Sequence, residues 1–504
     1  MSLLGIDVGT GGLKAMVVQA DTGTAVARAY REYPEARPRP GWVELSGDHV
    51  WDAFRAVVEE VNADPAVRAD PVTAMSFSIS CDEIVPLDRD KRALGNGIVS
   101  ADTRGSELIP HVKDRIDELE LFRVTGVPLH SMFPLVRLVW YQQNQPAILR
   151  AAAKFLGWGD LIIWRLGLPA VTDYSNAARW MAFDIRRRHW VSELFDVLEL
   201  PTDILPEALP SASVVGEVPS TMAEELGFQG SVMVATGAID QICAAIGGGM
   251  RRPGDAVVGT GTWEVLTTLV VEPPTDEASL RRGYAYSNFV VPDQFISMAA
   301  NSSGGALVRW FRDEFGQVES ATAASTGQDV YPLLLAEMPA EPTGILVLPH
   351  FQGSHNPWMD PRSKSAILGM TWHATRGHFL RALIEGMTFE LRANIDGLRK
   401  GGSRFEVLRN TGGGSRSPAW CQMKADILKL AIETVDIPEA GCLAAAILAG
   451  VATGVYPSFE EPQARFVRPA ARYEPDLATA DRYDELYDVY REVYPAVAPI
   501  THRL

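Results

Sequence analysis

The stretch LLGIDVGTGGLKA, residues 3–15, predicts a buried strand, a tight turn and a second strand. Leucine, isoleucine and valine side chains form the apolar first strand. Glycines at positions 9, 11 and 12 permit a turn whose backbone can approach a ligand closely. Thr10 adds a hydroxyl to the amides of that turn, and such groups together can hold phosphate oxygens. The stretch therefore fits either a phosphate-binding hairpin or a plain hairpin with a glycine turn.

The turn does not match the two most familiar phosphate-binding motifs. A Walker A loop would close with Gly-Lys-Ser or Gly-Lys-Thr, which does not follow here. A dinucleotide-binding fingerprint would lead into a helix, whereas a second strand is expected after the glycines. Asp7 lies beside the turn, and a carboxylate next to bound phosphate is repulsive unless a cation intervenes. Asp7 thus indicates a Mg²⁺ site, with a hydrogen-bonded turn aspartate as the alternative.

The size and charge of the chain restrict its class and its partners. With 504 residues it is too long for one core, so at least two domains are expected. A net charge of −17 argues against nucleic acid or an anionic membrane as a partner. The sequence has neither an apolar run long enough for a transmembrane helix nor the basic start of a secretory signal. Four scattered cysteines without a C-x-x-C pair indicate reduced thiols and a cytoplasmic protein.

The pattern of the first hairpin occurs a second time near the middle of the chain. Residues 256–262 read AVVGTGT, and another apolar run follows at 265–271. Such a repeat predicts two related α/β lobes that face a shared cleft. A run of three glycines at 247–249 precedes the second hairpin, so we place the domains at residues 1–248 and 249–504.

Hydrophobic periodicity predicts further elements. The expected strands are short apolar runs that end in polar or glycine residues, at 72–79, 233–236 and 405–408. The expected helices carry apolar residues at helical spacing, at 48–62, 376–400, 420–432 and 442–453. A last helix, 476–493, is polar and rich in tyrosine, and it is expected on the surface.

The ordered glycine-rich segments resemble the FGGY family of carbohydrate kinases. Residues 3–15 resemble the first phosphate loop of that family and residues 259–262 the second. The segment GGGSRSPAWCQ, residues 412–422, resembles the adenosine loop and is the most specific match, and EAGCLAAA, residues 439–446, is similar to the helix that follows. The resemblance extends over residues 3–494 and is closest to the xylulose-kinase-like subfamilies.

This resemblance implies an actin-like (ribonuclease-H-like) α/β fold, duplicated in two lobes with an ATP and sugar cleft between them. It implies ATP and Mg²⁺ as cofactors, with Asp7 on the metal side of the phosphates. The residues implied to contact the nucleotide or its metal lie in the three loops: Asp7, Gly9, Thr10, Gly11, Gly259, Thr260, Gly261, Thr262, Gly412, Gly413, Gly414, Ser417 and Gln422.

Asp240 is the candidate catalytic base. It follows an apolar strand and precedes a helix that begins with small residues. A carboxylate placed against the attacking hydroxyl can accept its proton while the phosphoryl group moves. The local sequence alone equally fits a helix N-cap aspartate, and resemblance to the catalytic position of the family favours the base.

Sugar contacts are expected from polar residues at strand ends of the first lobe. Asp82 and Glu83 follow the strand 72–79, and Asp102 and Arg104 lie in the segment SADTR, residues 100–104. Carboxylates accept hydrogen bonds from sugar hydroxyls, and arginine donates them. The second segment resembles the Trp-x-Asp-x-Arg motif of the family without its aromatic residue, and the Cys-Asp-Glu segment, residues 81–83, departs from the Gln-Met-His of related pentulose kinases. Asp102 to Arg104 also fits a solvated ion pair, and we assign no role to Arg137.

The predicted function is ATP-dependent phosphorylation of a hydroxyl on a small sugar. D-xylulose is the first candidate substrate, followed by another ketopentose or a polyol such as erythritol or glycerol. An actin-like or chaperone-like switch driven by ATP is the alternative from another class, and the nucleotide loops alone permit both. The expected partners are therefore small molecules, the sugar and ATP, and a homodimer is expected by resemblance only.

Overall fold

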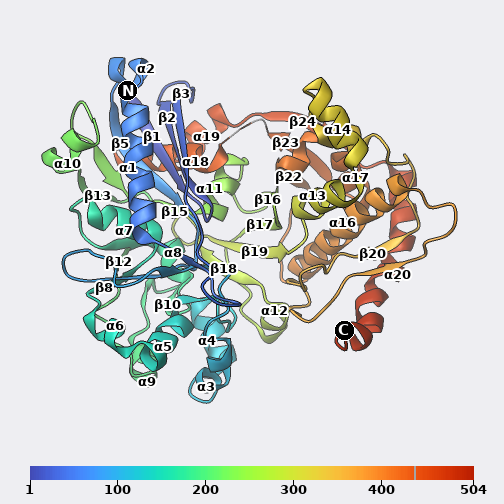
Figure 1. The fold of residues 1–504 in the computed structure, drawn as a ribbon, viewed down its shortest axis with the longest axis horizontal. Coiled ribbons are helices and arrows are strands. Elements are labelled where there is room, and N and C mark those ends of the chain that lie inside the picture. The colour runs from blue at the N-terminus through green and yellow to red at the C-terminus, as the bar shows by residue number, and fades with distance from the viewer. Residues whose placement is uncertain (436, 438) are drawn as a thin grey trace.

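The first hairpin lies at the centre of a seven-stranded sheet in the N-terminal lobe (Figure 1). The computed structural model describes residues 1–435, 437 and 439–504. In order across the sheet, the strands are β13 (Val214–Glu217), β14 (Met233–Ala235), β5 (Val72–Ile79), β1 (Ser2–Val8), β2 (Gly12–Gln19) and β3 (Ala25–Glu32), with β15 (Ala238–Ile239) also beside β5. β1 is antiparallel to β2 and parallel to β5, so the predicted hairpin is confirmed.

The second hairpin lies at the centre of the other seven-stranded sheet. Its strands, in order, are β18 (Ala285–Asn288), β19 (Phe295–Asn301), β17 (Glu264–Val270), β16 (Ala256–Thr260), β22 (Val407–Gly412), β23 (Ala431–Val435) and β24 (Pro469–Tyr473). β16 is antiparallel to β17 and parallel to β22, as β1 is to β2 and β5. In each lobe a long helix precedes the parallel strand in the chain: α1 (Gly47–Ala63) comes before β5, and α16 (Arg376–Lys400) comes before β22. The duplicated α/β architecture is therefore confirmed.

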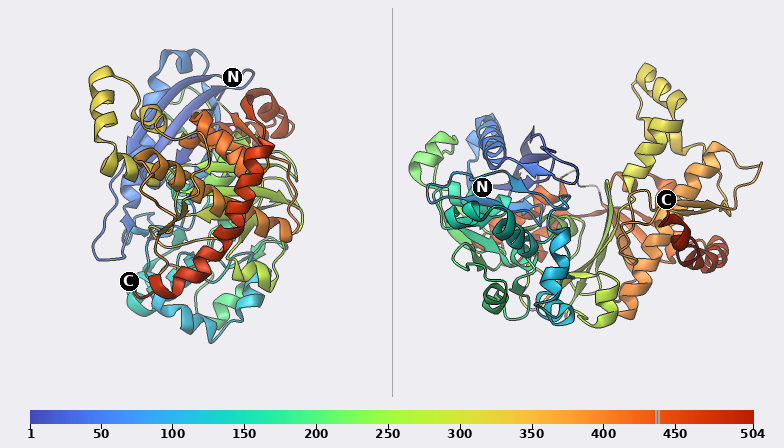
Figure 2. Two further views of the ribbon diagram at one scale, coloured as in Figure 1. Left: turned by 90° about the vertical axis from the view of Figure 1, so that its right-hand side faces the viewer. Right: turned by 60° about the horizontal axis from the view of Figure 1, so that its bottom comes forward.

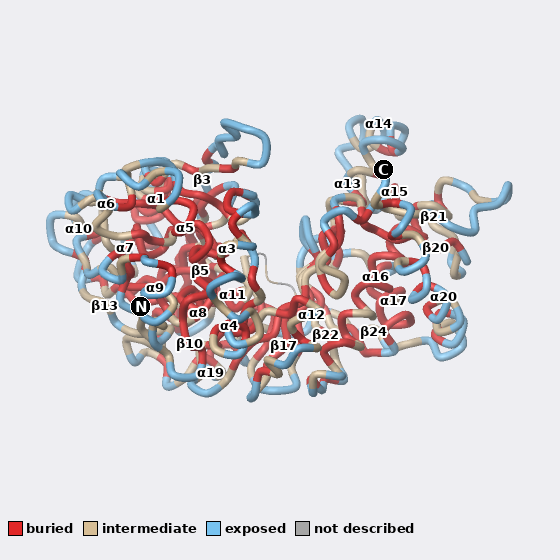
Figure 3. The backbone as a smooth tube through the Cα atoms, turned by 90° about the horizontal axis from the view of Figure 1, so that it is seen from below, coloured by how far each residue is buried: buried red, intermediate tan, exposed pale blue. Residues whose placement is uncertain are grey.

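Two small-residue helices link the lobes by packing together. α11 (Asp240–Gly247) follows the first sheet and contacts β16 and β17 of the second, whereas α18 (Ala440–Ala452) follows the second sheet and packs on β1 and β5 of the first. The contact is close, since a Cβ at Gly5 would lie 1.8 Å from the carbonyl oxygen of Cys442. Away from this junction the lobes diverge (Figures 2 and 3).

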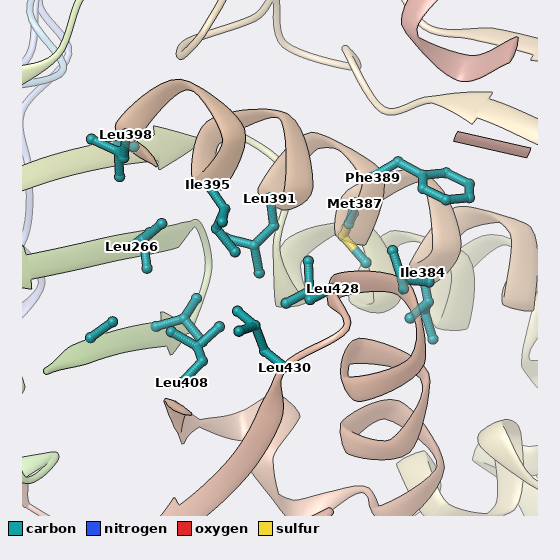
Figure 4. Packing of buried hydrophobic residues seen from close by; sticks show 14 of the residues in the cluster. Leu266, Ile384, Met387, Phe389, Leu391, Ile395, Leu398, Leu408, Leu428 and Leu430 are labelled. Atoms are coloured by element: carbon teal, nitrogen blue, oxygen red, sulfur yellow. The ribbon is translucent and has the colours of Figure 1, made fainter. Parts of the chain in front are cut away.

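The core of the second lobe is built on the buried side of α16. Figure 4 shows Ile384, Met387, Leu391 and Ile395 of this helix directed toward leucines of the sheet and of the neighbouring helix. Burial of each such side chain contributes about 1.5–3 kcal/mol. This packing fixes β16 and β22, whose ends carry the segments that the sequence predicts to bind phosphate and adenosine.

Each lobe contains further helices besides α1, α11, α16 and α18. In the first lobe they are α2 (Pro65–Ala69), α3 (Ile109–Lys113), α4 (Glu118–Thr125), α5 (Pro134–Asn144), α6 (Pro146–Ala151), α7 (Trp158–Arg165), α8 (Tyr174–Ala178), α9 (Ser192–Val197) and α10 (Ser220–Glu225). In the second they are α12 (Glu277–Arg281), α13 (Gly305–Phe315), α14 (Gln317–Thr326), α15 (Val330–Leu335), α17 (Pro418–Leu428), α19 (Glu460–Phe466) and α20 (Leu477–Thr501). Among the described residues, no helix is long and apolar enough to cross a membrane.

Two expected helices differ from the structure. The helix predicted over 420–432 ends at Leu428, because Lys429 adopts a left-handed conformation and the chain continues as β23. Alternate leucines, Leu428 and Leu430, enter one core, so the apolar pattern does not mark this boundary. The C-terminal helix, expected on the surface, instead buries three tyrosines whose hydroxyls bond to carboxylates of α16: Tyr483, Tyr487 and Tyr490.

Candidate active site

Asp240 begins α11, and a buried hydrogen-bond chain supports its backbone. Asp173 caps α8 and accepts a hydrogen bond from the hydroxyl of Ser175. The same hydroxyl oxygen accepts a hydrogen bond from the Ile239 amide at 2.9 Å. The Asp240 carboxylate accepts one hydrogen bond, from the Gln241 amide at 2.7 Å. Burial, and then the charge of nearby Asp7, raise the pKa of Asp240 to about 7, which suits a general base at neutral pH.

Asp7 lies near the end of β1, against the first turn of α18. It accepts a hydrogen bond of 2.7 Å from the Ser78 hydroxyl, and a Cβ at Gly441 would lie 2.9 Å from its Oδ1. Burial raises the pKa of Asp7 above its ordinary value, which shows that its charge is incompletely balanced. One half-buried carboxylate of this kind fits Mg²⁺, which takes one or two protein ligands and completes its shell with phosphates and water.

The two candidate sugar residues after β5 differ in their partners. Asp82 has a positive φ of 75° and forms a buried ion pair with Arg179, with both contacts at 2.8 Å. Glu83 is also buried, and neither of its carboxylate oxygens has a hydrogen-bond partner among the described residues. Burial, and then the charges of Asp82 and Asp240, raise the pKa of Glu83 well above its usual range. Asp82, Glu83 and Asp240 therefore lie close enough to influence one another electrostatically.

Arg137, to which the sequence assigns no role, has a positioning role in this lobe. It is fully buried on α5, and its guanidinium donates to the carbonyl oxygens of Asp82, Ile98 and Val99. Burial lowers its pKa to about 10, so it keeps its charge at neutral pH. Arg137 thus holds the segment after β5 beside the segment that leads to Asp102.

Asp102 and Arg104 are occupied by internal contacts. Arg104 donates to Asp102 at 2.6 Å and to Glu44 at 2.9 Å, and Asp102 also accepts from the Val43 amide. The Arg104 guanidinium lies over the ring of Trp42 at 4.0 Å. The solvated ion pair that the sequence also permitted is wrong, because both side chains are buried and bonded, and a sugar contact by either residue stays a prediction. Arg104 also lines a pocket of about 470 Å³ beside Trp42 and Trp140.

The three segments that the sequence predicts to bind the nucleotide differ in accessibility. At the first turn, Thr10 and Gly11 are exposed and Gly9 is half-buried. The second turn shows the same pattern, with Gly261 and Thr262 exposed and Gly259 half-buried. The side chain of Thr260, in contrast, is buried and bonded to Glu264 and Asn410, so only its backbone remains for a ligand. Gly412 and Gly413 are exposed, and Gly412 has a φ of 81°.

The last two predicted nucleotide residues bond within the protein. The Ser417 hydroxyl caps α17 by accepting from the Trp420 amide, and Gln422 donates to Asp426 and to the Glu474 carbonyl. Gly414 is buried against Thr260. Sequence reasoning missed Arg179 and the Asp173–Ser175 support of Asp240, because their partners lie far away in the chain. The only local signal was the Asp-x-Ser cap of a short helix.

The arrangement groups acidic side chains in one lobe and glycine-rich turns in both. After burial, the charges of Asp7 and Asp82 raise the pKa of Asp240, and the charges of Asp82 and Asp240 raise the pKa of Glu83, whereas Arg179 forms an ion pair with Asp82. Among the described residues, no group of three or more His, Cys, Asp or Glu could hold a metal by itself. The site can thus accept protons and bind hydroxyls on one side and phosphates on the other.

Comparison with known proteins identifies related chains. Residues 2–247 match the N-terminal domain model of the FGGY family of carbohydrate kinases, and residues 256–453 match its C-terminal domain model. A xylulose kinase from Bacillus subtilis is 27% identical, over 98% of this chain and 96% of its own length. A glycerol kinase from Halorhodospira halophila is 29% identical, over 96% and 94%. The crystal structure of a xylulose kinase from Lactobacillus acidophilus has the same fold, with a TM-score of 0.89 at 24% identity, over 100% of this chain and 99% of that one.

Proposed function

The chain belongs to the FGGY family of carbohydrate kinases and is a phosphotransferase with an alcohol acceptor; we propose that its acceptor is a pentulose, with D-xylulose as the first candidate, and that Asp240 is the general base. The assignment of Asp240 as the general base rests on its hydrogen bonding, its exposure and its pKa. It has one backbone hydrogen bond, partial exposure and a pKa raised to about 7 by burial and by Asp7. A carboxylate with this pKa is ionised in part at neutral pH and can still accept a proton.

In the proposed mechanism, Asp240 accepts the proton of the attacking sugar hydroxyl as that oxygen bonds to the γ-phosphorus of ATP and the bond to the β-phosphate oxygen breaks. This proton transfer contributes about 10²–10⁴-fold to the rate. The Asp173–Ser175 chain fixes the Ile239 amide and thereby orients Asp240 at the start of α11. The amides of Thr10, Gly11 and Thr262, which donate to no backbone carbonyl among the described residues, would bind the phosphate oxygens, whose charge must be stabilised during transfer.

Mg²⁺, when bound, would neutralise phosphate charge, and Asp7 is the residue of this chain that would hold it, through water. The incompletely balanced charge of Asp7 supports this assignment. The Ser78 hydroxyl would orient the carboxylate through its hydrogen bond. The resting position of Asp7 against α18 also benefits from the helix N-terminus, which favours negative charge.

The acidic side of the site supports a neutral acceptor that is rich in hydroxyl groups. Glu83 and Asp240 can accept hydrogen bonds from hydroxyls, and Glu83 has no other partner among the described residues. The relatives reported above are kinases of xylulose and glycerol, a ketose and a polyol. Another ketopentose, erythritol and glycerol therefore follow D-xylulose as candidates.

A coupled assay of ADP release over a substrate panel tests this proposal. The panel contains D-xylulose, D-ribulose, erythritol, glycerol and D-gluconate, each with ATP and Mg²⁺. The expected result is ADP release that saturates with a neutral pentulose and that Asp240→Asn abolishes, which rules out a contaminating kinase. Equal ADP release with and without every sugar would contradict the proposal and favour an ATP-driven conformational switch.

Cytoplasmic location and a homodimer are part of the same proposal. All four cysteines, Cys81, Cys243, Cys421 and Cys442, are free thiols, which supports a reducing compartment. The homodimer rests on resemblance alone. Light scattering of the purified chain tests it, since a monomer mass would reject it.

A further inference from the structure

A buried polar cluster lies under the turn between β16 and β17. Lys424 of α17 forms an ion pair with Glu264 of β17 at 2.6 Å. The same ammonium donates to the Thr260 hydroxyl at 2.6 Å and to the Asn410 side chain, on β22, at 3.3 Å. Lys424 and Asn410 are 0% exposed, Thr260 is 1% and Glu264 is 2% exposed. The three donors of one ammonium thus meet acceptors from three strands.

The cluster does more than fill space in the core. Removing two charges from water costs several kcal/mol per ion, so a buried pair is weak evidence for stability alone. An apolar pair of similar volume would serve a core equally well or better. The charged pair instead imposes geometry, because an ammonium with three fixed acceptors specifies where each of them must lie.

The residues that Lys424 fixes are those that carry the nucleotide loops. Thr260 and Glu264 are the two ends of the second phosphate turn, and they face each other in the β16–β17 register. Asn410 lies two residues before Gly412, where the adenosine loop begins. A Cβ at Gly412 would lie 2.6 Å from the Thr260 carbonyl oxygen, and one at Gly414 would lie 2.6 Å from its methyl group. Both loops therefore rest on Thr260, which Lys424 holds.

We propose that Lys424 is a positioning residue that fixes the phosphate turn after β16 and the adenosine loop after β22 relative to each other, and so sets the affinity for ATP without touching it. This role rests on the proposed function, in which these two loops bind the nucleotide. A loss of the ammonium frees the turn and the loop to move independently, and a ligand that must bridge them binds less tightly.

The test compares two variants that each break a buried ion pair of the second lobe. Lys424→Met removes the cluster, and Arg381→Met removes the pair of Arg381 with Glu385, 2.8 Å apart on α16. Both variants are expected to lose stability. Only Lys424→Met is expected to weaken binding of a non-hydrolysable ATP analogue, by at least tenfold in calorimetry, and to raise the KM for ATP while the KM for sugar stays within twofold. Equal analogue affinity in Lys424→Met and wild type would overturn the proposal.

A double variant separates positioning from stability. Lys424→Met with Glu264→Met replaces the pair by apolar side chains and is expected to regain stability, with analogue binding still at least tenfold weaker than in wild type. Recovery of both properties would show a structural role only and overturn the proposal. If Lys424→Met does not fold, the double variant and Thr260→Val provide the same comparison. A wild-type chain that binds no nucleotide would overturn the proposed function itself, and with it this role of Lys424.

Discussion

The two Gly-Thr-Gly turns have the same sequence and opposite surroundings. In the first, Thr10 is exposed at the tip of the β1–β2 hairpin, and the carboxylates around that turn are only partly balanced. In the second, Thr260 is the last residue of β16, and its side chain is buried in the Lys424 cluster. Each turn offers backbone amides, so the difference lies in the side chains beneath them.

This difference indicates a division of labour between the duplicated halves. Unpaired acidic groups with raised pKa values lie in the first lobe, where a base and a metal ligand are needed: Asp7, Glu83 and Asp240. In the second lobe the charge beneath the turn is paired, Lys424 with Glu264, and this pair fixes the geometry of the turn. The predictions below test this division.

Asp240→Asn is expected to have the largest effect. It removes the proton acceptor and keeps the shape, so kcat should fall by about 10²–10⁴-fold. The affinity for ATP should stay within about twofold, because Asp240 is not in the nucleotide loops. Steady-state kinetics and calorimetry with an ATP analogue measure the two effects. Turnover near the wild-type value would reject Asp240 as the base.

Asp7→Asn is expected to have an intermediate effect. A carboxylate that orients a metal through water typically contributes about 10–100-fold to metal affinity or activity. The loss of activity should decrease as the Mg²⁺ concentration is raised, because the site still binds the metal weakly. Titration of activity against Mg²⁺ in both proteins measures this. An unchanged Mg²⁺ dependence would place Asp7 outside the metal site.

A matched pair of threonine variants tests the comparison between the turns. Thr260→Val removes one of the buried hydrogen-bond partners of Lys424 and of Asn410, and should lower the free energy of unfolding by about 1–3 kcal/mol. Thr10→Val, on an exposed turn, should change it by no more than about 0.5 kcal/mol. Urea unfolding of both variants gives the values. Equal losses would show that the two turns are supported alike.

The pH dependence of both stability and kcat should follow the titration of Asp240. The change in stability is the smaller of these two effects. Its pKa is about 7 in the folded chain and 3.8 as the reference value, so the folded state holds the proton longer than the unfolded state. Stability from this group is therefore present at low pH and is lost as pH rises toward 7. Asp240→Asn should be more stable than wild type at pH 8, by about 1 kcal/mol after allowance for solvent screening. kcat of the wild type should rise through pH 7, and a flat profile would argue against this base.

The sequence predicted the parts of the molecule that depend on local patterns. Both hairpins, the strand of β5 and the long helix α16 were correct, because glycine turns and apolar periodicity are local signals. β23 was missed, since a left-handed Lys429 ends α17 inside a continuous apolar pattern.

The parts of the site that depend on distant contacts could not be predicted. Arg179 lies 97 residues from Asp82, and Lys424 lies 164 residues from Thr260. Neither residue has a local signal, because an arginine at the end of a helix and a lysine within one are ordinarily solvated. The internal contacts of Asp102 and Arg104 could not be predicted either, because their partners, Val43 and Glu44, come from a segment about 60 residues earlier. The roles assigned to the loops and to Asp240 stay predictions.

The division of labour between the two lobes is tested most directly by one single-turnover experiment. Wild type, Asp240→Asn and Thr260→Val are mixed with γ-labelled ATP and D-xylulose, with ATP and sugar concentrations that saturate each protein, and the label in sugar phosphate is followed by rapid quenching. The account predicts transfer at the wild-type rate in Thr260→Val and transfer slowed by about 10²–10⁴-fold in Asp240→Asn. Transfer at the wild-type rate in Asp240→Asn, or equal slowing in both variants, would contradict it.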